Sequence, residues 1–203
     1  MKNWKALASD ESIQNAIEAL KANGIDAMVV ENGDRAKKKV FEIIPQNAEV
    51  MSMSSVTLDT TGITKEINES GKYNSVKNKL AKMDRKTQER EMQKLGAAPE
   101  YAVGSVHAVT EDGKVIIASN TGSQLPAYAY GSAHVIWVVG TQKIVANLEQ
   151  GLKRIYEYVL PLESERLKKV YGVESNVSKL LIINKEIAPN RLTLILVKQK
   201  LGF

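Results

Sequence analysis

The chain has no cysteine. This absence excludes disulfides, thiolate zinc sites and cysteine-ligated iron–sulfur clusters. The two histidines, His107 and His134, are too few for a histidine-based metal cluster. Carboxylate side chains could still bind magnesium, but no group of them stands out in the sequence. We therefore predict no metal and no cofactor.

Long hydrophobic runs are also missing. No apolar stretch approaches the ~20 residues that a membrane-spanning helix needs. The N-terminal stretch carries acidic residues where a signal peptide needs a continuous apolar segment. We therefore expect a cytoplasmic protein with no membrane partner.

Positive charge is concentrated in one segment, residues 72–94, whose eight basic and three acidic side chains account for the whole net charge of +5. The segment is open to three interpretations: a solvated helix face, an electropositive flap over an acidic ligand, or a nucleic-acid surface. It contains one aromatic residue, Tyr73, and matches no recognition module. We therefore expect no nucleic-acid partner.

The rest of the chain alternates strand and helix patterns. The spacing of Ile13, Ile17 and Leu20 predicts a helix that ends near Gly24. Further elements are expected in this order: strand Ile25–Val30, helix from Gly33 to Pro45, strand Ala48–Met53, helix Thr57–Glu69, strands Tyr101–Thr110 and Lys114–Ala118 around an Asp112-Gly113 hairpin turn, strand His134–Val139, helices Asn147–Val159 and Glu163–Tyr171, and strands Leu180–Asn184 and Leu192–Val197.

This order is typical of the α/β class, with a parallel sheet covered by helices on both faces. At 203 residues the chain is long enough for one full core, and a second domain is not required. We predict a single domain over residues 1–203, with residues 72–98 as a basic, mostly helical insertion.

The most informative stretch is Val115–Gly140, in which an apolar run leads into a polar turn and a short helix. The turn offers hydroxyls and unpaired backbone N–H groups, the donors that bind anions at helix N-termini. Pro126 is tolerated in a first helical turn, so the helix is expected to begin near Gly122–Leu125. The alternative is an ordinary helix cap. The candidate ligand-binding residues here are Asn120, Thr121, Gly122, Ser123 and Gln124.

An earlier turn, with Ser54 and Ser55, repeats this design. If both turns end neighbouring parallel strands, they face one crevice beyond the carboxyl ends of those strands.

Four further residues are candidates for the same site. Gly104, Ser105 and His107 belong to the predicted strand Tyr101–Thr110, on which Ser105, His107 and Val109 share one face. His107 is a proton carrier or ligand donor in one interpretation and a structural histidine in the other. Lys143 follows the His134–Val139 strand and is either the cation nearest a bound anion or a surface lysine.

Other polar groups have simpler interpretations. His134 is expected to be structural, and Asp112 to serve the hairpin turn, although it could reach a sugar hydroxyl. Glu186 and Arg191 bracket the last turn and are expected to pair. No carboxylate pair, Ser–His–Asp order or Cys–His pair stands out, so the sequence predicts no catalytic residue and does not show whether the protein is an enzyme.

Several segments together resemble the LUD (lactate-utilisation domain) family. They are Gly104–Gly113 followed by Ser119–Gln124, then Val135–Val145, together with Ser54–Gly62, Arg154–Arg166 and the ending Leu201–Phe203. The resemblance covers nearly the whole chain. It implies a parallel-rich three-layer α/β sandwich like the NagB/RpiA/CoA-transferase-like fold, with a hairpin and extra helices.

The resemblance also implies function, because some LUD proteins are implicated in oxidising lactate to pyruvate alongside iron–sulfur partner proteins. We therefore expect a protein that binds a small anionic or phosphorylated metabolite and supports lactate or organic-acid utilisation. One alternative is an isomerase or CoA/acyl transferase, which needs a carboxylate or lysine near the ligand. The other is a non-catalytic subunit of a redox assembly that docks through residues 72–94. The sequence leaves open whether the chain forms a homodimer.

Overall fold

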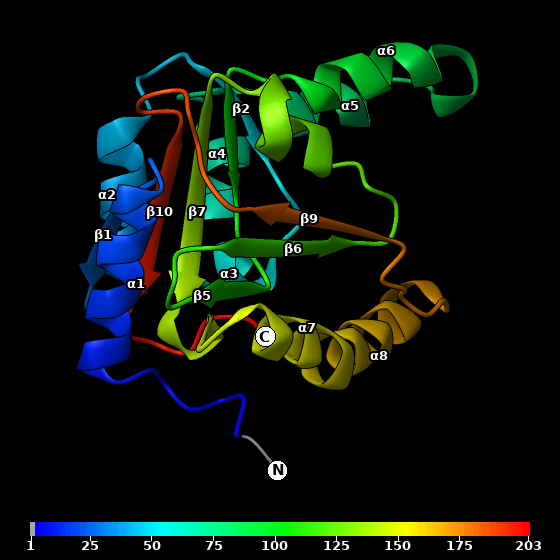
Figure 1. Cartoon of the computed structure of the whole chain (residues 1–203). Helices are drawn as coiled ribbons and strands as arrows, with labels where there is room; N and C mark the ends of the chain where they lie inside the picture. The colour runs from blue at the N-terminus through cyan, green and yellow to red at the C-terminus, as the bar shows by residue number, and fades with distance from the viewer. Residues whose placement is uncertain (1–2) are drawn as a thin grey trace.

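A wholly parallel six-stranded sheet forms the centre of the molecule (Figure 1). The computed structural model describes residues 3–203, so residues 1 and 2 of the predicted domain lie outside the described part. The strands follow one another across the sheet in the order β1 (Asp26–Val30), β10 (Leu192–Val197), β7 (His134–Gly140), β4 (Tyr101–Gly104), β2 (Glu49–Ser52) and β3 (Asn74–Ser75). β7 and β10 are nearly continuous apolar runs, as expected for parallel strands buried on both faces.

A second, four-stranded sheet crosses in front of the first (Figure 1). Its order is β8 (Ile144–Val145), β5 (Ala108–Thr110), β6 (Val115–Ser119) and β9 (Lys179–Ile183). β5 and β6 form the predicted hairpin, in which Gly113 has φ +80°. Glycine adopts this left-handed conformation at little cost, which explains the Asp-Gly pair.

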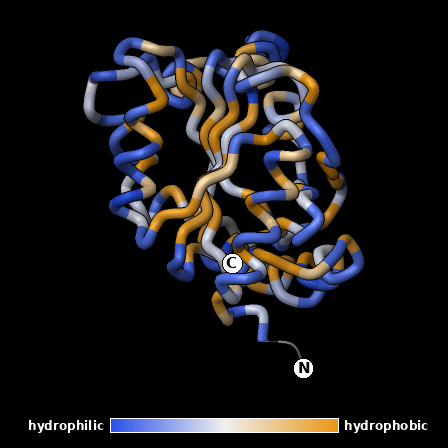
Figure 2. The backbone as a smooth tube through the Cα atoms, turned by 60° about the vertical axis from the view of Figure 1, so that its left-hand side comes forward, coloured by the Kyte–Doolittle hydropathy of each residue, from blue (hydrophilic) through white to orange (hydrophobic). Residues whose placement is uncertain are grey.

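Helices cover both faces of the parallel sheet. On one face lie α2 (Gly33–Ile43), α3 (Val56–Thr60) and α4 (Ile63–Glu69), which contact β10, β7 and β2 in turn and bury Val40, Leu58 and Ile67 in the core of this face. On the other face lie α1 (Asp10–Ala22), the short helix η1 (Ala127–Gly131) and the second sheet. Figure 2 shows the apolar strands in the interior and polar chain on the outside. The α/β, parallel-rich fold predicted from the sequence is confirmed.

The outer face of the second sheet is covered by a continuous helical run made of α7 (Leu148–Arg154), η3 (Ile155–Val159) and α8 (Leu160–Tyr171). The sequence analysis predicted two separate helices, Asn147–Val159 and Glu163–Tyr171, and the expected break between them, at Pro161, is absent. The five residues of η3, which precede this region, form a wider π-type turn. A widened turn accommodates the proline, which has no N–H to donate.

The basic segment 72–98 includes β3 of the central sheet and is otherwise mostly helical. It contains α5 (Val76–Ala81) and α6 (Arg85–Ala97), which extend from one corner of the molecule (Figure 1). None of the thirteen residues of α6 is buried.

Two further boundaries differ from the prediction. The expected helix Thr57–Glu69 is divided into α3 and α4 by Gly62, which has φ +69°. The expected strand Tyr101–Thr110 is divided into β4 and β5, which belong to different sheets. Ser105 and His107 lie in the connection between these strands, so the period-two argument that put them on one strand face does not apply.

Candidate functional site

Three adjacent parallel strands, β2, β4 and β7, end at the same edge of the sheet. The connection after β2 contains Ser54 and Ser55 and leads to Thr57 in α3. The connection after β4 contains Ser105, Val106 and His107. After β7, the 3-10 turn η2 (Thr141–Lys143) begins at once. The predicted crevice edge therefore brings together polar residues from three chain segments.

Lys143 joins these segments. Its Nζ donates to Ser105 Oγ at 3.1 Å, to the Val106 carbonyl at 3.1 Å and to Thr57 Oγ1 at 3.4 Å. The side chain is buried, so the interpretation of Lys143 as a surface lysine is wrong. All three of these acceptors are neutral oxygens, and no ion pair to Lys143 occurs within residues 3–203.

Burial, together with the nearby charge of Arg154, lowers the pKa of Lys143 to about 7. A buried ammonium group without a carboxylate loses its hydration and gains no opposite charge in return. The amine is therefore poised to take up a proton when a negative charge arrives.

Arg154 is a second buried cation, at the end of α7. Its Nη1 donates to the His107 carbonyl at 2.6 Å, and its guanidinium lies 5.3 Å from the centre of the Tyr158 ring. α7 lies close to the second sheet because Gly151 has no side chain; a Cβ there would lie 2.2 Å from Ile116 Cδ1. The sequence analysis missed Arg154 as a site residue. One sequence feature could have indicated Arg154: it is a charged residue beside the apolar stripe of the predicted helix Asn147–Val159.

His107 lies between the two cations. The Ala118 N–H donates to its Nδ1 at 3.1 Å, which leaves the imidazole hydrogen on Nε2 in the neutral form. Burial, together with the charges of Lys143 and Arg154, lowers the pKa of His107 to about 3. The histidine is therefore neutral near pH 7 and can act as a hydrogen-bond donor rather than as a proton carrier.

The last residues of the described chain pass over Lys143. The Leu201 carbonyl accepts from Thr57 Oγ1 at 3.2 Å and from Gln142 Nε2 at 2.9 Å. Gly202 has φ +63°, and a Cβ there would lie 2.7 Å from Thr57 Oγ1, so only glycine lets the backbone pass this close to Thr57. The sequence analysis did not include Thr57, Gln142 or Leu201 among the site residues.

The predicted turn Ser119–Gln124 lies elsewhere in the fold. The expectation that it ends a strand next to β2 is wrong, because β6 belongs to the second sheet and is antiparallel to both of its neighbours. The donors of the turn are used locally: Gly122 N–H donates to Ser119 Oγ, and Ser123 N–H donates to Thr121 Oγ1. Ser119 Oγ in turn donates to Gln124 Oε1.

The other predicted residues make contacts that stabilise the fold. Asn120 Oδ1 accepts from Ser178 Oγ, and the side chain of Lys179 lies against Gly122. A Cβ on Gly104 would overlap the hydroxyl of Tyr128, so this glycine allows the tyrosine to pack across β4. The expected pair of Glu186 and Arg191 is confirmed at 2.7 Å.

A small pocket of about 50 Å³ brings His107 together with Ser119 and Asn120. It unites predicted residues from both groups. Its other lining residues are Ala118, Ile155, Val159, Leu160, Glu163, Ser175, Asn176 and Val177.

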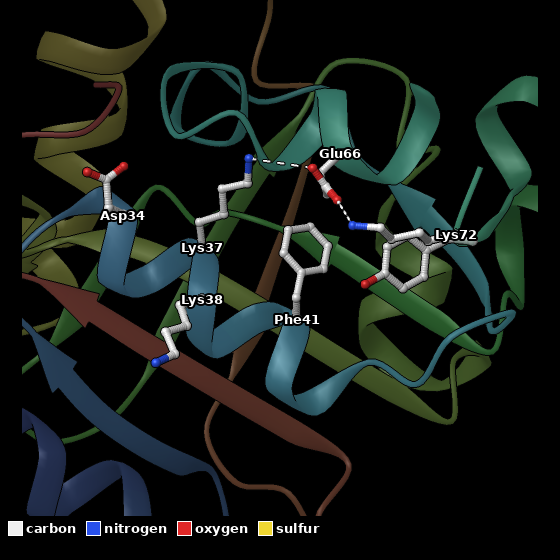
Figure 3. Close-up of a pocket in the computed structure, with 7 residues that line it drawn as sticks. Asp34, Lys37, Lys38, Phe41, Glu66 and Lys72 are labelled. Carbon is white, nitrogen blue, oxygen red and sulfur yellow. Dashed lines mark hydrogen bonds and ion pairs between the residues drawn. The ribbon is translucent and has the colours of Figure 1, made fainter. Parts of the chain in front are cut away.

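A larger open hollow of about 380 Å³ lies between α2 and α4 (Figure 3). Figure 3 shows Lys37 and Lys72 reaching Glu66 from opposite sides, at 3.7 and 2.9 Å. None of the predicted site residues lines this hollow, and these two lysines already have an acidic partner. We therefore do not place the site there.

Within residues 3–203 no group of histidine and carboxylate side chains is arranged to hold a metal ion, and no helix is both long and apolar enough to cross a membrane.

Comparisons with known proteins agree with the architecture. The model of a family described as the LUD domain matches residues 13–197. A crystal structure of a DUF162 family protein from Deinococcus radiodurans superposes with a TM-score of 0.60 at 11% sequence identity, covering 95% of this chain and 99% of that one. At this identity the likeness concerns the fold alone. A comparison with curated proteins gives no match.

Proposed function

Because the chain belongs to the LUD domain family, we propose that it is a cytoplasmic protein that binds a small anionic metabolite at Lys143 and supports the utilisation of lactate or a similar organic acid. The proposal depends on one observation: the Lys143 amine is buried, and no carboxylate of residues 3–203 pairs with it. Neither the pKa of Lys143 nor that of His107 is shifted by any carboxylate. A ligand anion supplies the missing opposite charge, and the hydroxyls of Ser105 and Thr57 supply hydrogen bonds around it.

A thermal-shift panel of lactate, pyruvate, CoA and sugar phosphates tests this proposal. A ligand at ~100 times its dissociation constant stabilises the fold by about 2.7 kcal/mol. We expect at least one acid to raise the melting temperature of the wild type and to leave that of Lys143→Met unchanged.

Lys198→Met is the matched control. Lys198 also follows a parallel strand, β10, but it is partly exposed and pairs with Asp10 at 2.7 Å. Its replacement should preserve the ligand response. The proposal fails if no acid or phosphate shifts the melting temperature at millimolar concentration.

The alternative of an isomerase or transferase needs a carboxylate or lysine near the ligand, for which Asp112, Glu111 and Lys143 are the candidates. The Asp112 carboxylate bonds to Thr110 and Lys114 in the hairpin, so Lys143 is the candidate that lies at the proposed site. Gly113, next to Asp112, packs against Ala19 of α1. If the protein takes part in lactate oxidation, electrons must pass to other subunits, because the chain has no cysteine to hold an iron–sulfur cluster.

The exposed α5–α6 arm favours a second role, as a docking surface for such a subunit. Two basic side chains of residues 72–94, Lys72 and Lys79, pair with acids of the body. Within residues 3–203 the other six have no ion pair: Lys77, Lys82, Arg85, Lys86, Arg90 and Lys94. Tyr73 stacks on Phe41 at 5.4 Å and is therefore not available to stack on a nucleic-acid base.

A pull-down with a cluster-bearing partner tests this role. Reversing the charges of Arg85 and Lys86 should weaken the association, and unchanged association would exclude the arm as the docking surface.

A further inference from the structure

We propose that the open edge of β1 pairs with the same edge of a second copy of this chain, so that the two parallel sheets join into one continuous sheet across a two-fold axis.

β1 is the edge strand that is least protected against pairing. Within residues 3–203 the edge strands of the two sheets are β1, β3, β8 and β9. β3 and β8 have two residues each, and β9 begins with Lys179, a residue type that disfavours the approach of another strand. β1 has five residues, with no lysine and no proline among them. Its edge is therefore suited to pair with a further strand.

The backbone groups that point outward from β1 belong to Ala27 and Val29. The Val30 carbonyl accepts from the Lys198 N–H at 2.9 Å, so Val30 faces β10. Because the backbone groups of successive residues point to opposite edges of a strand, Met28 also faces β10, whereas Ala27 and Val29 face away from it. Within residues 3–203 no other strand pairs with β1, so these N–H and C=O groups are open to a partner.

This edge also carries apolar surface. Val29 is 37% exposed, although it belongs to a strand of the central sheet. Figure 2 brings the left side of Figure 1 forward, and β1 faces the viewer there between α1 and α2. A strand that pairs with this edge therefore satisfies the open backbone groups and covers Val29 at the same time.

A second copy of β1 matches this edge when the two strands run antiparallel about Met28. Ala27 then lies opposite the partner's Val29, and Val29 lies opposite the partner's Ala27. All of these residues have outward-facing backbone groups, so each pair exchanges both of its N–H···O bonds. Dimers with two-fold symmetry use one self-complementary patch in this way.

The charges beside β1 favour the same antiparallel arrangement. Asp26 lies on the same face of the sheet as Met28 and Val30, which pack in the core under α2. In the antiparallel pair, Asp26 lies opposite the partner's Val30, at the end of the strand where the partner's α2 begins. The N-terminus of a helix attracts a carboxylate.

Arg35, in the first turn of α2, is the cation at that end. Lys37 and Phe41 line the hollow between α2 and α4, so Arg35 lies on a different side of the helix (Figure 3). α4 contacts β2 and α2 contacts β10, so the side of α2 away from α4 is the side toward β1. Asp26 and Arg35 are both exposed, and neither has an ion pair within residues 3–203. Each copy therefore offers an unpaired acid and an unpaired cation that complement those of the other copy.

The proposed pairing leaves the other surfaces of the molecule free. β1 and β3 are the opposite edges of the parallel sheet, and the α5–α6 arm follows β3. The arms of the two copies therefore lie at the far ends of the joined sheet. Lys143 lies beyond the ends of β2, β4 and β7, away from the β1 edge.

Sedimentation velocity of the purified full chain tests the proposal. We expect the wild type to be a dimer at about 100 µM. Val29→Lys puts a charge on the proposed seam and should weaken the dimer at least about tenfold. Leu180→Lys is the matched control, because Leu180 is 39% exposed on the other five-residue edge strand, β9. This control should dimerise as the wild type does.

The charged residues give an independent test. Asp26→Arg and Arg35→Asp each bring like charges together in a dimer of one variant, so each variant alone should dimerise at least about tenfold more weakly than the wild type. In an equimolar mixture, a dimer with one chain of each kind has opposite charges at both contacts. The mixture should therefore dimerise as strongly as the wild type.

A wild type that is monomeric at about 100 µM would overturn the proposal. A dimer that persists in Val29→Lys, or one that is lost in Leu180→Lys, would place the interface elsewhere and overturn it as well. If Val29→Lys does not fold, the mixing experiment decides, and a mixture no stronger than its separate components counts against the proposal.

Discussion

At the scale of single residues, two cations donate hydrogen bonds to the backbone carbonyls of two consecutive residues in the connection between β4 and β5. Lys143 donates to the Val106 carbonyl and Arg154 to the His107 carbonyl. Neither cation has an acidic partner within residues 3–203. Removing one partner of a buried ion pair costs several kcal/mol. Under the proposed function, a ligand anion supplies the negative partner. Burial, together with the charges of Lys143 and Arg154, lowers the pKa of His107 to about 3.

The depressed pKa of His107 makes a prediction for acid stability. Between pH 6.5 and 3 the unfolded chain binds a proton at this residue and the folded protein does not, so stability falls as pH falls. From about pH 7.5 to 5 this effect removes about 2 kcal/mol. His107→Gln keeps an acceptor for the Ala118 N–H and cannot titrate, so it should lose about 2 kcal/mol less than the wild type over that range. Urea unfolding at several pH values measures the difference, and equal slopes for the two proteins would contradict the account.

At the scale of elements, two helices of equal length differ in how many side chains they bury in the core. α1 and α6 each have thirteen residues, but α1 buries Ile13, Ala16, Ile17 and Leu20 whereas α6 buries none. A helix of this length that buries none of its side chains is marginal in water. α6 also contains a non-helical residue, Gln88.

Hydrogen exchange should therefore separate these two helices. We expect the amides of α6 to exchange at least about a hundredfold faster than those of α1, because local opening of an unpacked helix exposes little apolar surface. Mass spectrometry of peptic peptides from the two segments measures the rates. Equal protection would show that a partner, such as a second copy of the chain, covers the arm.

The elements also show which features of the fold can be predicted from sequence patterns. The parallel strands, the hairpin and the helices α1 and α2 could be predicted because each depends on local signals: apolar runs, Asp112-Gly113, the helical spacing of Ile13, Ile17 and Leu20, and the stop at Pro45. Lys143 could be placed at a strand end for the same reason. The assignment of β6 to a second sheet could not be predicted. Pairing between strands that are distant in sequence depends on the whole fold and not on a local pattern of residues. Arg154 was missed because its role depends on the close approach of α7 that Gly151 permits.

At the scale of the whole molecule, the end of the described chain closes the edge of the parallel sheet. Leu201 is 1% exposed and belongs to the core under α2 and α4, while its carbonyl binds Gln142 and Thr57. The segments after β2, β7 and β10 are therefore held as one unit around Lys143.

Shortening Leu201 tests this coupling. Leu201→Ala should lower the free energy of unfolding by about 2–4 kcal/mol, because a buried leucine loses both burial and packing. Ile187→Ala is the control, since Ile187 is 91% exposed and its loss should change stability by less than about 0.5 kcal/mol. Chemical denaturation of both variants gives the comparison, and a small effect at Leu201 would show that the chain end is dispensable for the core.

The most direct test of the central claim is proton uptake on ligand binding. Calorimetric titration of lactate or pyruvate, at about pH 8 in buffers of different ionisation enthalpy, counts the protons taken up. Most Lys143 amines are neutral at that pH, so binding of an anion should take up close to one proton in the wild type and none in Lys143→Met. Binding without proton uptake in the wild type, or the same uptake in Lys143→Met, would contradict the account.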